Sequence, residues 1–207
     1  MMVKEGIPFM IPTLLLAAGV LWAVGSAGLP VLILPLYVAA FFRNPRRLIP
    51  ADEKTLLAPA DGKIIDIKEV EEGRFLKRQV RKISIFMSPL DVHINRIPCT
   101  GRVKGIHYNP GKKFAAFREK ASLENEQNAV LMESDRGQEI LFVQIAGFLA
   151  RRIVCYLKPG DRIVRGERYG LIRFGSRMDI YLPLEAQVTV RLGERARGGE
   201  TILARFP

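Results

Sequence analysis

The sequence predicts a mainly β (α+β) protein, in which an N-terminal apolar helical hairpin precedes a β-rich barrel or sandwich. No charged side chain occurs between Ile7 and Phe42, whereas the chain beyond residue 50 consists of short apolar runs separated by turn residues. The chain is 48% hydrophobic and 26% charged, a balance typical of folded proteins and not of disordered ones.

The apolar segment divides at residues 25–30, GSAGLP, into two runs. As helices, Ile7 to Val24 would be about 27 Å long and Val31 to Phe42 about 18 Å long. Because a hydrocarbon core is about 30 Å thick, the first run barely spans it and the second is too short. Two placements follow: a re-entrant or interfacial hairpin with both ends on one face, or a single tilted span that uses the first run.

Basic residues flank the apolar segment, with Lys4 before it and Arg43, Arg46 and Arg47 after it. The positive-inside bias places the residues after 43 in the cytoplasm under either placement. A signal peptide is the alternative, but a second apolar run and the arginines follow the VGSAG stretch. We therefore expect a retained anchor at the cell membrane, with a peripheral or monotopic domain on the cytoplasmic face.

The net charge of +11 indicates an anionic partner. Beside a membrane anchor, an anionic membrane surface explains this charge better than a nucleic acid, for which the sequence contains no recognisable motif. The two cysteines, Cys99 and Cys155, form no CxxC pair and the chain has only two histidines, so no metal site is predicted.

Residues 1–48 are thus predicted to form the anchoring segment and a basic linker, and residues 49–207 a β-rich domain. Turn sequences such as APADGK, SDRGQE and KPGDRI separate its strand-like runs. Strands are predicted in GKIIDIKEV, RKISIFMS, AVLMES, EILFVQIAG, RRIVCYLK, YGLIRF, MDIYLP and AQVTVRL. The best helical candidate is FAAFREKASLENE at 114–126, although its mixed charges are equally consistent with a loop.

Three polar residues lie at the ends of extended runs: Asp61 in PADGKI, His93 in FMSPLDVHINRIP and Ser176 in FGSR. A carboxylate, an imidazole and a hydroxyl are the groups of a nucleophilic triad. The spacing alone leaves the question open. An Asp before Gly is usually a turn residue, a lone His is usually structural, and Gly-Ser is an ordinary turn pair.

The chain resembles the phosphatidylserine decarboxylases, in the short form found in many bacteria and in archaea. The resemblance rests on FFRNPRR, APADGKI, FMSPLDVHINRIP, NPGKKFAAFREKASLENEQN and AGFLARRIVCYLKPGDRIVRGERYGLIRFGSRMDIYLP, which occur in this order along nearly the whole chain. It implies a fold similar to the barrel-sandwich hybrids. It also implies decarboxylation of phosphatidylserine to phosphatidylethanolamine, a step of phospholipid biosynthesis.

Members of this family are proenzymes that cleave themselves at a Gly-Ser bond, which the resemblance places at Gly175–Ser176. The serine becomes a pyruvoyl group, the only cofactor, which forms a Schiff base with the amine of the substrate. The products would be a β chain of residues 1–175 and an α chain of residues 176–207. Together they form an α/β heterodimer, and dimers are common in the family.

The resemblance also assigns roles to the upstream residues. His93 matches the histidine of the D-x-H motif and is the candidate acid that protonates the product carbon. Asp61 matches the aspartate that orients a histidine during self-cleavage. Longer members carry a second histidine three residues after the first, where this chain has Arg96. Either His93 serves both steps or another group replaces the missing base. Arg96 is a candidate for binding the substrate carboxylate or phosphate, and a structural salt bridge is equally consistent.

Two alternatives stay open from the sequence. An archaetidylserine decarboxylase would use the same mechanism, because the reaction takes place at the headgroup and not at the tails. A non-enzymatic, membrane-tethered β-barrel carrier or scaffold module would keep the fold without the activity.

Overall fold

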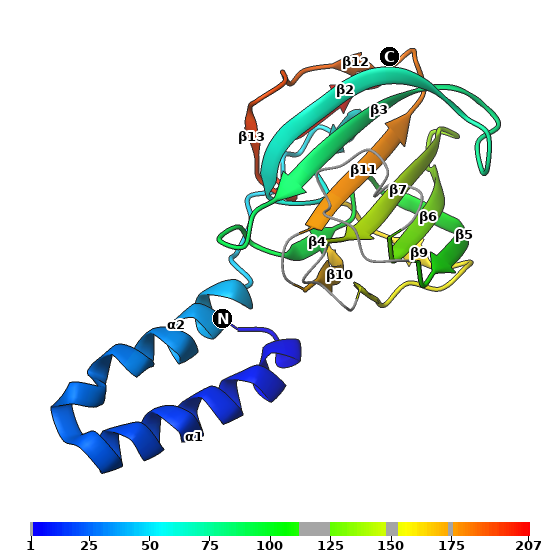
Figure 1. Cartoon of the computed structure of the whole chain (residues 1–207). Coiled ribbons are helices and arrows are strands. Elements are labelled where there is room, and N and C mark those ends of the chain that lie inside the picture. The colour runs from blue at the N-terminus through cyan, green and yellow to red at the C-terminus, as the bar shows by residue number, and fades with distance from the viewer. Residues whose placement is uncertain (1, 112–124, 148–152, 174–175) are drawn as a thin grey trace. The chain divides into compact units, whose positions relative to one another are not determined.

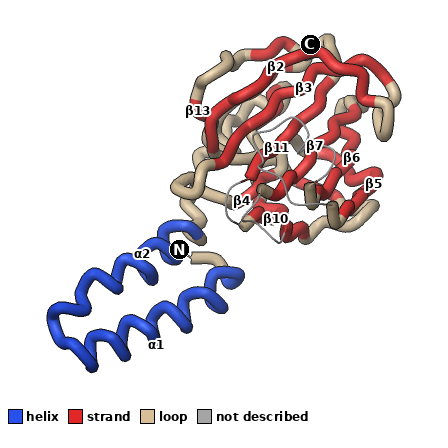
Figure 2. Tube along the Cα trace, viewed as in Figure 1, coloured by secondary structure: helices blue, strands red, loops and turns tan. Residues whose placement is uncertain are grey.

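A computed structural model describes residues 2–111, 125–147, 153–173 and 176–207. The chain divides into two compact units, Met1–Arg46 and Arg47–Pro207. The first unit is helical, and the described residues of the second form β-strands and the loops that join them (Figures 1 and 2). The predicted fold class, mainly β with an N-terminal apolar helical hairpin, is confirmed.

The N-terminal unit is a helical hairpin. Its elements are η1 (Lys4–Gly6), α1 (Ile7–Val24), η2 (Gly25–Leu32) and α2 (Ile33–Phe41). Gly25 ends α1 with a φ of 61°, a conformation that glycine adopts without steric cost. The base of the hairpin is closed where the Val3 amide donates to the Phe42 carbonyl at 2.9 Å, and the Phe9 and Phe42 rings stack 5.4 Å apart.

The helices of this unit expose large apolar side chains, among them Leu15, Leu36 and Trp22, whose exposed fraction is 90%. The helical run Lys4–Phe41 contains a stretch with a mean hydropathy of 2.1 and is long and apolar enough to cross a membrane. Apolar surface in water costs about 25 cal/mol per Å². This unit is therefore suited to an apolar surrounding, as both predicted placements require.

The described residues of the second unit form fourteen strands. They are β1 (Thr55–Leu57), β2 (Gly62–Glu72), β3 (Arg78–Met87), β4 (Ile94–Arg96), β5 (Gly101–Asn109), β6 (Gln127–Ser134), β7 (Glu139–Ala146), β8 (Ile153–Cys155), β9 (Arg162–Ile163), β10 (Arg168–Ile172), β11 (Ser176–Leu182), β12 (Gln187–Val188), β13 (Arg195–Ala196) and β14 (Ile202–Arg205). A curled eight-stranded sheet has the order β13-β2-β3-β11-β7-β6-β5-β9, and two three-stranded sheets have the orders β4-β10-β8 and β1-β14-β12 (Figure 1).

Every run predicted as a strand contains one, although β8 and β12 are shorter than expected. Strands β1, β4, β5, β9, β13 and β14 were not predicted. The sequence of β5, GRVKGIHYN, includes glycines and charged residues that weaken a strand pattern, and its pairing with β6 is what makes it a strand. The candidate helix at 114–126 lies, up to residue 124, outside the described residues.

Strand β11 lies in the middle of the large sheet and pairs antiparallel with β3 and β7. Ser176, its first residue, is opposite Met87 on one side and Ala146 on the other. Because successive side chains alternate between the two faces, Ser176 shares a face with Met178 and Ile180, both of which are in the main hydrophobic core. The start of β11 is thus held by hydrogen-bonded strands on both sides.

The sheet β4-β10-β8 aligns Asn95, Gly170 and Cys155 side by side. Only a glycine fits at position 170, because a Cβ there would lie 2.1 Å from the Val154 carbonyl oxygen and 3.2 Å from Nε2 of Gln144. Gln144 is on β7 of the large sheet and donates to the Val154 carbonyl at 3.3 Å. The side chain of Gln144 therefore crosses from one sheet to the other.

Candidate active site

Ser176 is fully buried, and its hydroxyl donates to the thioether sulfur of Met87 at 3.3 Å. The side chain points toward the core because Ser176 is on the same face of β11 as the core residues Met178 and Ile180. A thioether is a weak hydrogen-bond acceptor, so this hydroxyl is held loosely for a buried group. Gly175, the other residue of the predicted cleavage site, lies outside the described residues.

Arg177 and Asp179 follow on the opposite face of β11 and form a buried ion pair. The Nε–Oδ1 distance is 2.9 Å and the Nη2–Oδ2 distance is 3.0 Å. Both residues are almost fully buried. Breaking such a pair leaves an uncompensated buried charge. The ion pair therefore holds the first residues of β11 in one conformation. The sequence analysis had assigned these two residues no role.

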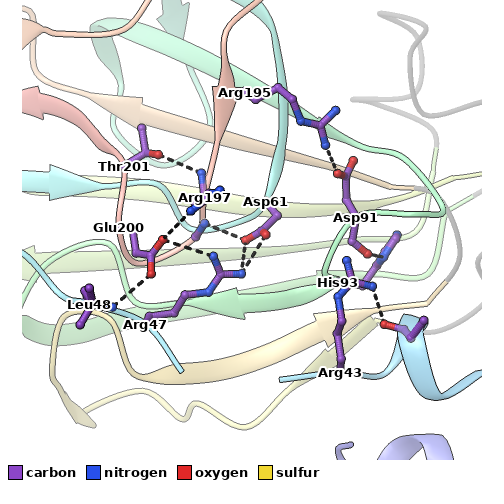
Figure 3. Close-up of polar contacts among 12 residues, drawn as sticks. Arg43, Arg47, Leu48, Asp61, Asp91, His93, Arg195, Arg197, Glu200 and Thr201 are labelled. Carbon is purple, nitrogen blue, oxygen red and sulfur yellow. Dashed lines mark hydrogen bonds and ion pairs between the residues drawn. The ribbon is translucent and has the colours of Figure 1, made fainter. Parts of the chain in front are cut away.

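His93 is buried and lies beside Asp91 (Figure 3). Asp91 closes a tight turn that begins at Ser88. The Asp91 amide donates to the Ser88 carbonyl at 2.9 Å, and the Ser88 amide donates to Asp91 Oδ2 at 2.8 Å. The Asp91 carboxylate also pairs with Arg195, which comes from β13. The turn is therefore cross-linked to a strand more than 100 residues later, and nothing in the sequence pattern indicated that Arg195 would do this.

The ring orientation of His93 follows from its contact with Asp91. Nδ1 lies 3.0 Å from the backbone carbonyl oxygen of Asp91. A carbonyl only accepts hydrogen bonds, so Nδ1 carries a proton and Nε2 is the nitrogen that gains or loses one. The group that orients His93 in this way is a backbone carbonyl.

Asp61 lies at the centre of a charged cluster with Arg47 and Glu200 (Figure 3). Both of its oxygens accept from Nη2 of Arg47 at 2.8 Å, and Oδ1 also accepts from the Gly198 amide at 2.8 Å. Arg47 Nη1 lies 3.6 Å from Glu200 Oε2, and the Arg47 side chain is only 6% exposed. Within the described parts of the chain, the hydrogen bonds of Asp61 go to these groups and not to His93.

Arg96 is buried next to this cluster and donates from Nη1 to the Gly166 carbonyl at 2.9 Å. Burial lowers the pKa of its guanidinium and the charge of Arg47 lowers it further, while the carboxylates of Asp61 and Glu200 act in the opposite direction. An arginine stays protonated even when its pKa falls from above 12. The structure thus places a buried positive charge at the position of Arg96, to which the family resemblance had assigned a second histidine in longer members.

The sequence-predicted residues therefore lie in three places. Asp61 and Arg96 belong to the charged cluster, His93 lies beside the turn that Asp91 closes, and Ser176 lies at the core face of β11. Between the sheets, three buried amides without a sequence-predicted role are hydrogen-bonded to one another: Asn95, Gln144 and Asn128. Asn95 and Ser176 both contact the sulfur of Met87. Asn95 was within the quoted motif FMSPLDVHINRIP, but nothing in its spacing distinguished it.

The described residues contain no group of three or more His, Cys, Asp or Glu side chains that could hold a metal ion. Both cysteines are free thiols, and burial raises the pKa of Cys99 to about 12. Such a thiol is protonated at neutral pH and is a poor nucleophile or metal ligand. Cys99 is therefore a core residue.

Comparison with known proteins agrees with the motifs. The family model described as phosphatidylserine decarboxylase matches residues 34–204. A phosphatidylserine decarboxylase proenzyme of Rickettsia akari is 52% identical over 169 residues, which cover 80% of this chain and 73% of that protein. The proenzyme of Geobacter metallireducens is 46% identical over 211 residues, which cover 98% and 95% of the two chains. The chain belongs to the phosphatidylserine decarboxylase family.

Proposed function

We propose that this protein decarboxylates phosphatidylserine to phosphatidylethanolamine with a pyruvoyl group made from Ser176. The observation that carries the proposal is the position of Ser176, fully buried at the first residue of a central strand. If the chain is cut before Ser176, β11 still pairs with β3 and β7 along its length, and β14 still pairs with β1. The α chain would therefore stay assembled with the β chain as a heterodimer.

The surroundings of residue 176 fit a pyruvoyl group. Its neighbours across the ladder, Met87 and Ala146, are apolar and buried, which keeps water away from a reactive carbonyl. Once formed, the group supplies a ketone that condenses with the substrate amine and accepts the electrons released as carbon dioxide leaves. The protein must hold the headgroup, orient it and deliver a proton.

Self-cleavage would begin at Ser176 itself. Oγ adds to the carbonyl carbon of Gly175, the C–N bond breaks, and the hydroxyl proton ends on the Ser176 nitrogen, which leaves an ester. Loss of the Cα proton then expels Oγ with the new carboxyl terminus of the β chain, and water releases ammonia to complete the ketone. The weak contact with Met87 supports this role, because it leaves Oγ free to react.

His93 is our proposed proton carrier. Its Nδ1 proton is held by the Asp91 carbonyl, so Nε2 is the position that would take a proton in self-cleavage and deliver one to the product carbon in turnover. Asp91 and Arg195 act as positioning residues, because they hold the turn that places the ring.

Arg96 and Asp61 are proposed to serve the headgroup. The buried guanidinium of Arg96 suits the phosphate or carboxylate of the substrate. Asp61 would support it by holding Arg47 and by offsetting the repulsion between the two arginines, which its contacts favour over the orientation of a histidine.

We further propose that the protein reaches its lipid from the cytoplasmic face of the cell membrane, as a peripheral or monotopic protein. The closed base of the hairpin brings residues 2 and 43 together in an antiparallel bridge, which supports entry and exit on one face. The exposed apolar helices and the net charge of +11 support contact with an anionic bilayer.

The test compares Ser176→Ala with Ser26→Ala. Ser26 belongs to the second Gly-Ser pair of the sequence, Gly25-Ser26, and lies in the N-terminal hairpin, so Ser26→Ala is a matched control. Intact mass should show two chains for the starting protein and for Ser26→Ala, with an α chain that begins with a pyruvoyl group. Ser176→Ala should stay uncut and release no carbon dioxide from phosphatidylserine vesicles. A single uncut chain that still releases carbon dioxide would contradict the proposal.

A further inference from the structure

Three buried amide side chains form a hydrogen-bonded chain between the two sheets. Asn128 Nδ2 donates to Gln144 Oε1 at 3.0 Å, and Gln144 Nε2 donates to Asn95 Oδ1 at 2.9 Å. Asn95 and Gln144 are completely buried and Asn128 nearly so. Buried amides are costly unless they are bonded, so a chain of three within a core requires an explanation beyond packing.

A backbone carbonyl determines which way all three amides point. Gln144 also contacts the Val154 carbonyl oxygen, at 3.3 Å, and a carbonyl only accepts. The atom of Gln144 that faces it must therefore be the NH2 group, which then requires Oδ1 of Asn95 on its other side. The NH2 group of Asn95 is consequently turned away from Gln144. The oxygen and the nitrogen of the Asn95 amide are thus identified from the contacts of Gln144, and not from the contact of Asn95 with Met87.

The NH2 group of Asn95 is directed toward the residue that holds Ser176. Asn95 Nδ2 lies 3.9 Å from Sδ of Met87, and the same sulfur accepts the Ser176 hydroxyl at 3.3 Å. Two donors thus converge on one weak acceptor in a buried site. The NH2 group of Asn95 is a strong donor whose partner, the Met87 sulfur, is weak. It is therefore available for a better acceptor that forms later beside Met87.

We propose that the Asn95 amide donates a hydrogen bond to Oγ of residue 176 as that oxygen leaves during self-cleavage, and that Gln144 and Asn128 hold the amide in this orientation. This inference rests on the proposed conversion of Ser176. Asn95 is the donor, and Gln144 and Asn128 are positioning residues.

The elimination step is where such a donor acts. A proton leaves Cα of residue 176 to the base, for which His93 is proposed, and its electron pair forms the Cα–Cβ double bond. The Cβ–Oγ bond breaks, and its electron pair goes to Oγ, which leaves as part of the carboxylate that ends the β chain. Negative charge therefore develops on Oγ, and a fixed donor in a dry site stabilises developing charge strongly.

The experiment follows the ester that precedes elimination. Asn95→Leu keeps the branched shape and the number of heavy side-chain atoms and removes the donor, so elimination should slow by roughly tenfold to a hundredfold and the ester should accumulate. Hydroxylamine splits that ester and releases an α chain that begins with unmodified serine, whereas completed processing gives an α chain with a pyruvoyl terminus. Intact mass distinguishes the two. Gln144→Leu, which frees the amide of Asn95, should cause a smaller accumulation.

Gln127→Leu is the matched control, because Gln127 is a buried amide next to Asn128 on the opposite face of β6. It should accumulate no ester. Asn95→Asp tests the same role without a change of shape. Its carboxyl donates only when protonated, so the rate of its elimination relative to that of the unaltered protein at the same pH should rise as the pH is lowered.

Two outcomes would overturn the inference. One is normal processing of Asn95→Leu and Asn95→Asp with no hydroxylamine-sensitive ester, and the other is an uncut Asn95 variant that hydroxylamine does not split. If the unaltered protein itself yields no pyruvoyl terminus, the proposed function fails instead. The mass of the starting protein therefore separates the two failures.

Discussion

Ser176 and Asp61 are both polar residues of the candidate active site, and their surroundings differ in kind. Asp61 accepts two hydrogen bonds from Arg47 and one from Gly198, all at 2.8 Å. Ser176 is fully buried and donates to a thioether at 3.3 Å. The strong polar contacts are thus made by Asp61, whereas the Ser176 hydroxyl, which we propose to react, has a weak one.

This difference has a physical reason. A strong bond to a reacting group in its resting state lowers the energy of that state and raises the barrier to reaction, unless the bond strengthens in the transition state. The contacts of Asp61 with Arg47 can be strong because neither group has to move or lose its charge. A thioether beside Ser176 excludes water without stabilising the hydroxyl. We therefore expect mutations among the reacting groups around Ser176 to change the rate of the reaction, and mutations in the Asp61 cluster to change the stability of the fold.

The largest effect on turnover is expected at His93, which is held by a carbonyl and not by the carboxylate of Asp61. His93→Ala should reduce the rate of carbon dioxide release per pyruvoyl-bearing α chain by at least about 100-fold, because a positioned acid or base contributes that much. His107→Ala is the control, since His107 is exposed and contacts the Phe75 ring. Near-normal cleavage and turnover in His93→Ala would remove His93 from the mechanism.

A large effect on stability is expected at Asp61. Asp61→Asn leaves the buried Arg47 without its main partner and should lower the free energy of unfolding by about 2–4 kcal/mol, slightly less than for a fully buried pair. Urea unfolding in the Ser176→Ala background measures this on a single chain. Lys104→Gln breaks an exposed pair with Glu133 and should leave the midpoint unchanged. Equal urea midpoints for both variants would mean that the Asp61 cluster does not stabilise the fold.

The smallest effect is expected at Asp66, which pairs with Lys82 at 3.0 Å and Lys68 at 3.3 Å. Partial burial raises the pKa of this carboxyl, but the hydrogen bond and charge of Lys82, followed by those of Lys68, outweigh it and the pKa lies below its usual value. A lowered folded-state pKa contributes stability above the unfolded value of about 3.9 and loses it as the pH falls through the folded value.

The contribution of Asp66 should be below about 1 kcal/mol, because the carboxylate is partly exposed and solvent screens its pairing with the lysines. Urea midpoints from pH 7 to pH 2.5 should therefore converge for Asp66→Asn and the parent protein at the acid end. A difference that persists unchanged at pH 2.5 would show that packing, and not charge, is the contribution of Asp66.

Much of the fold was predictable because its signals are local. The uninterrupted apolar run up to Phe42, the alternating runs of β2, β3 and β11 and the continuous apolar run of β7 depend on neighbouring residues only. Strands β5 and β14 were missed because long-range pairing, with β6 in one case and with β1 and β12 in the other, makes them strands.

For the site, the sequence by itself determined the motifs that hold Asp61, His93, Arg96 and Ser176 and the family that they indicate. Only the tertiary structure decided which groups meet. It pairs Asp61 with Arg47, Asp91 with Arg195 and Asn95 with Gln144, and it turns Ser176 toward Met87. These partners are 14 to 104 residues apart in the chain. Periodicity and spacing report on one strand or turn, whereas such contacts depend on how the sheets pair, curl and pack.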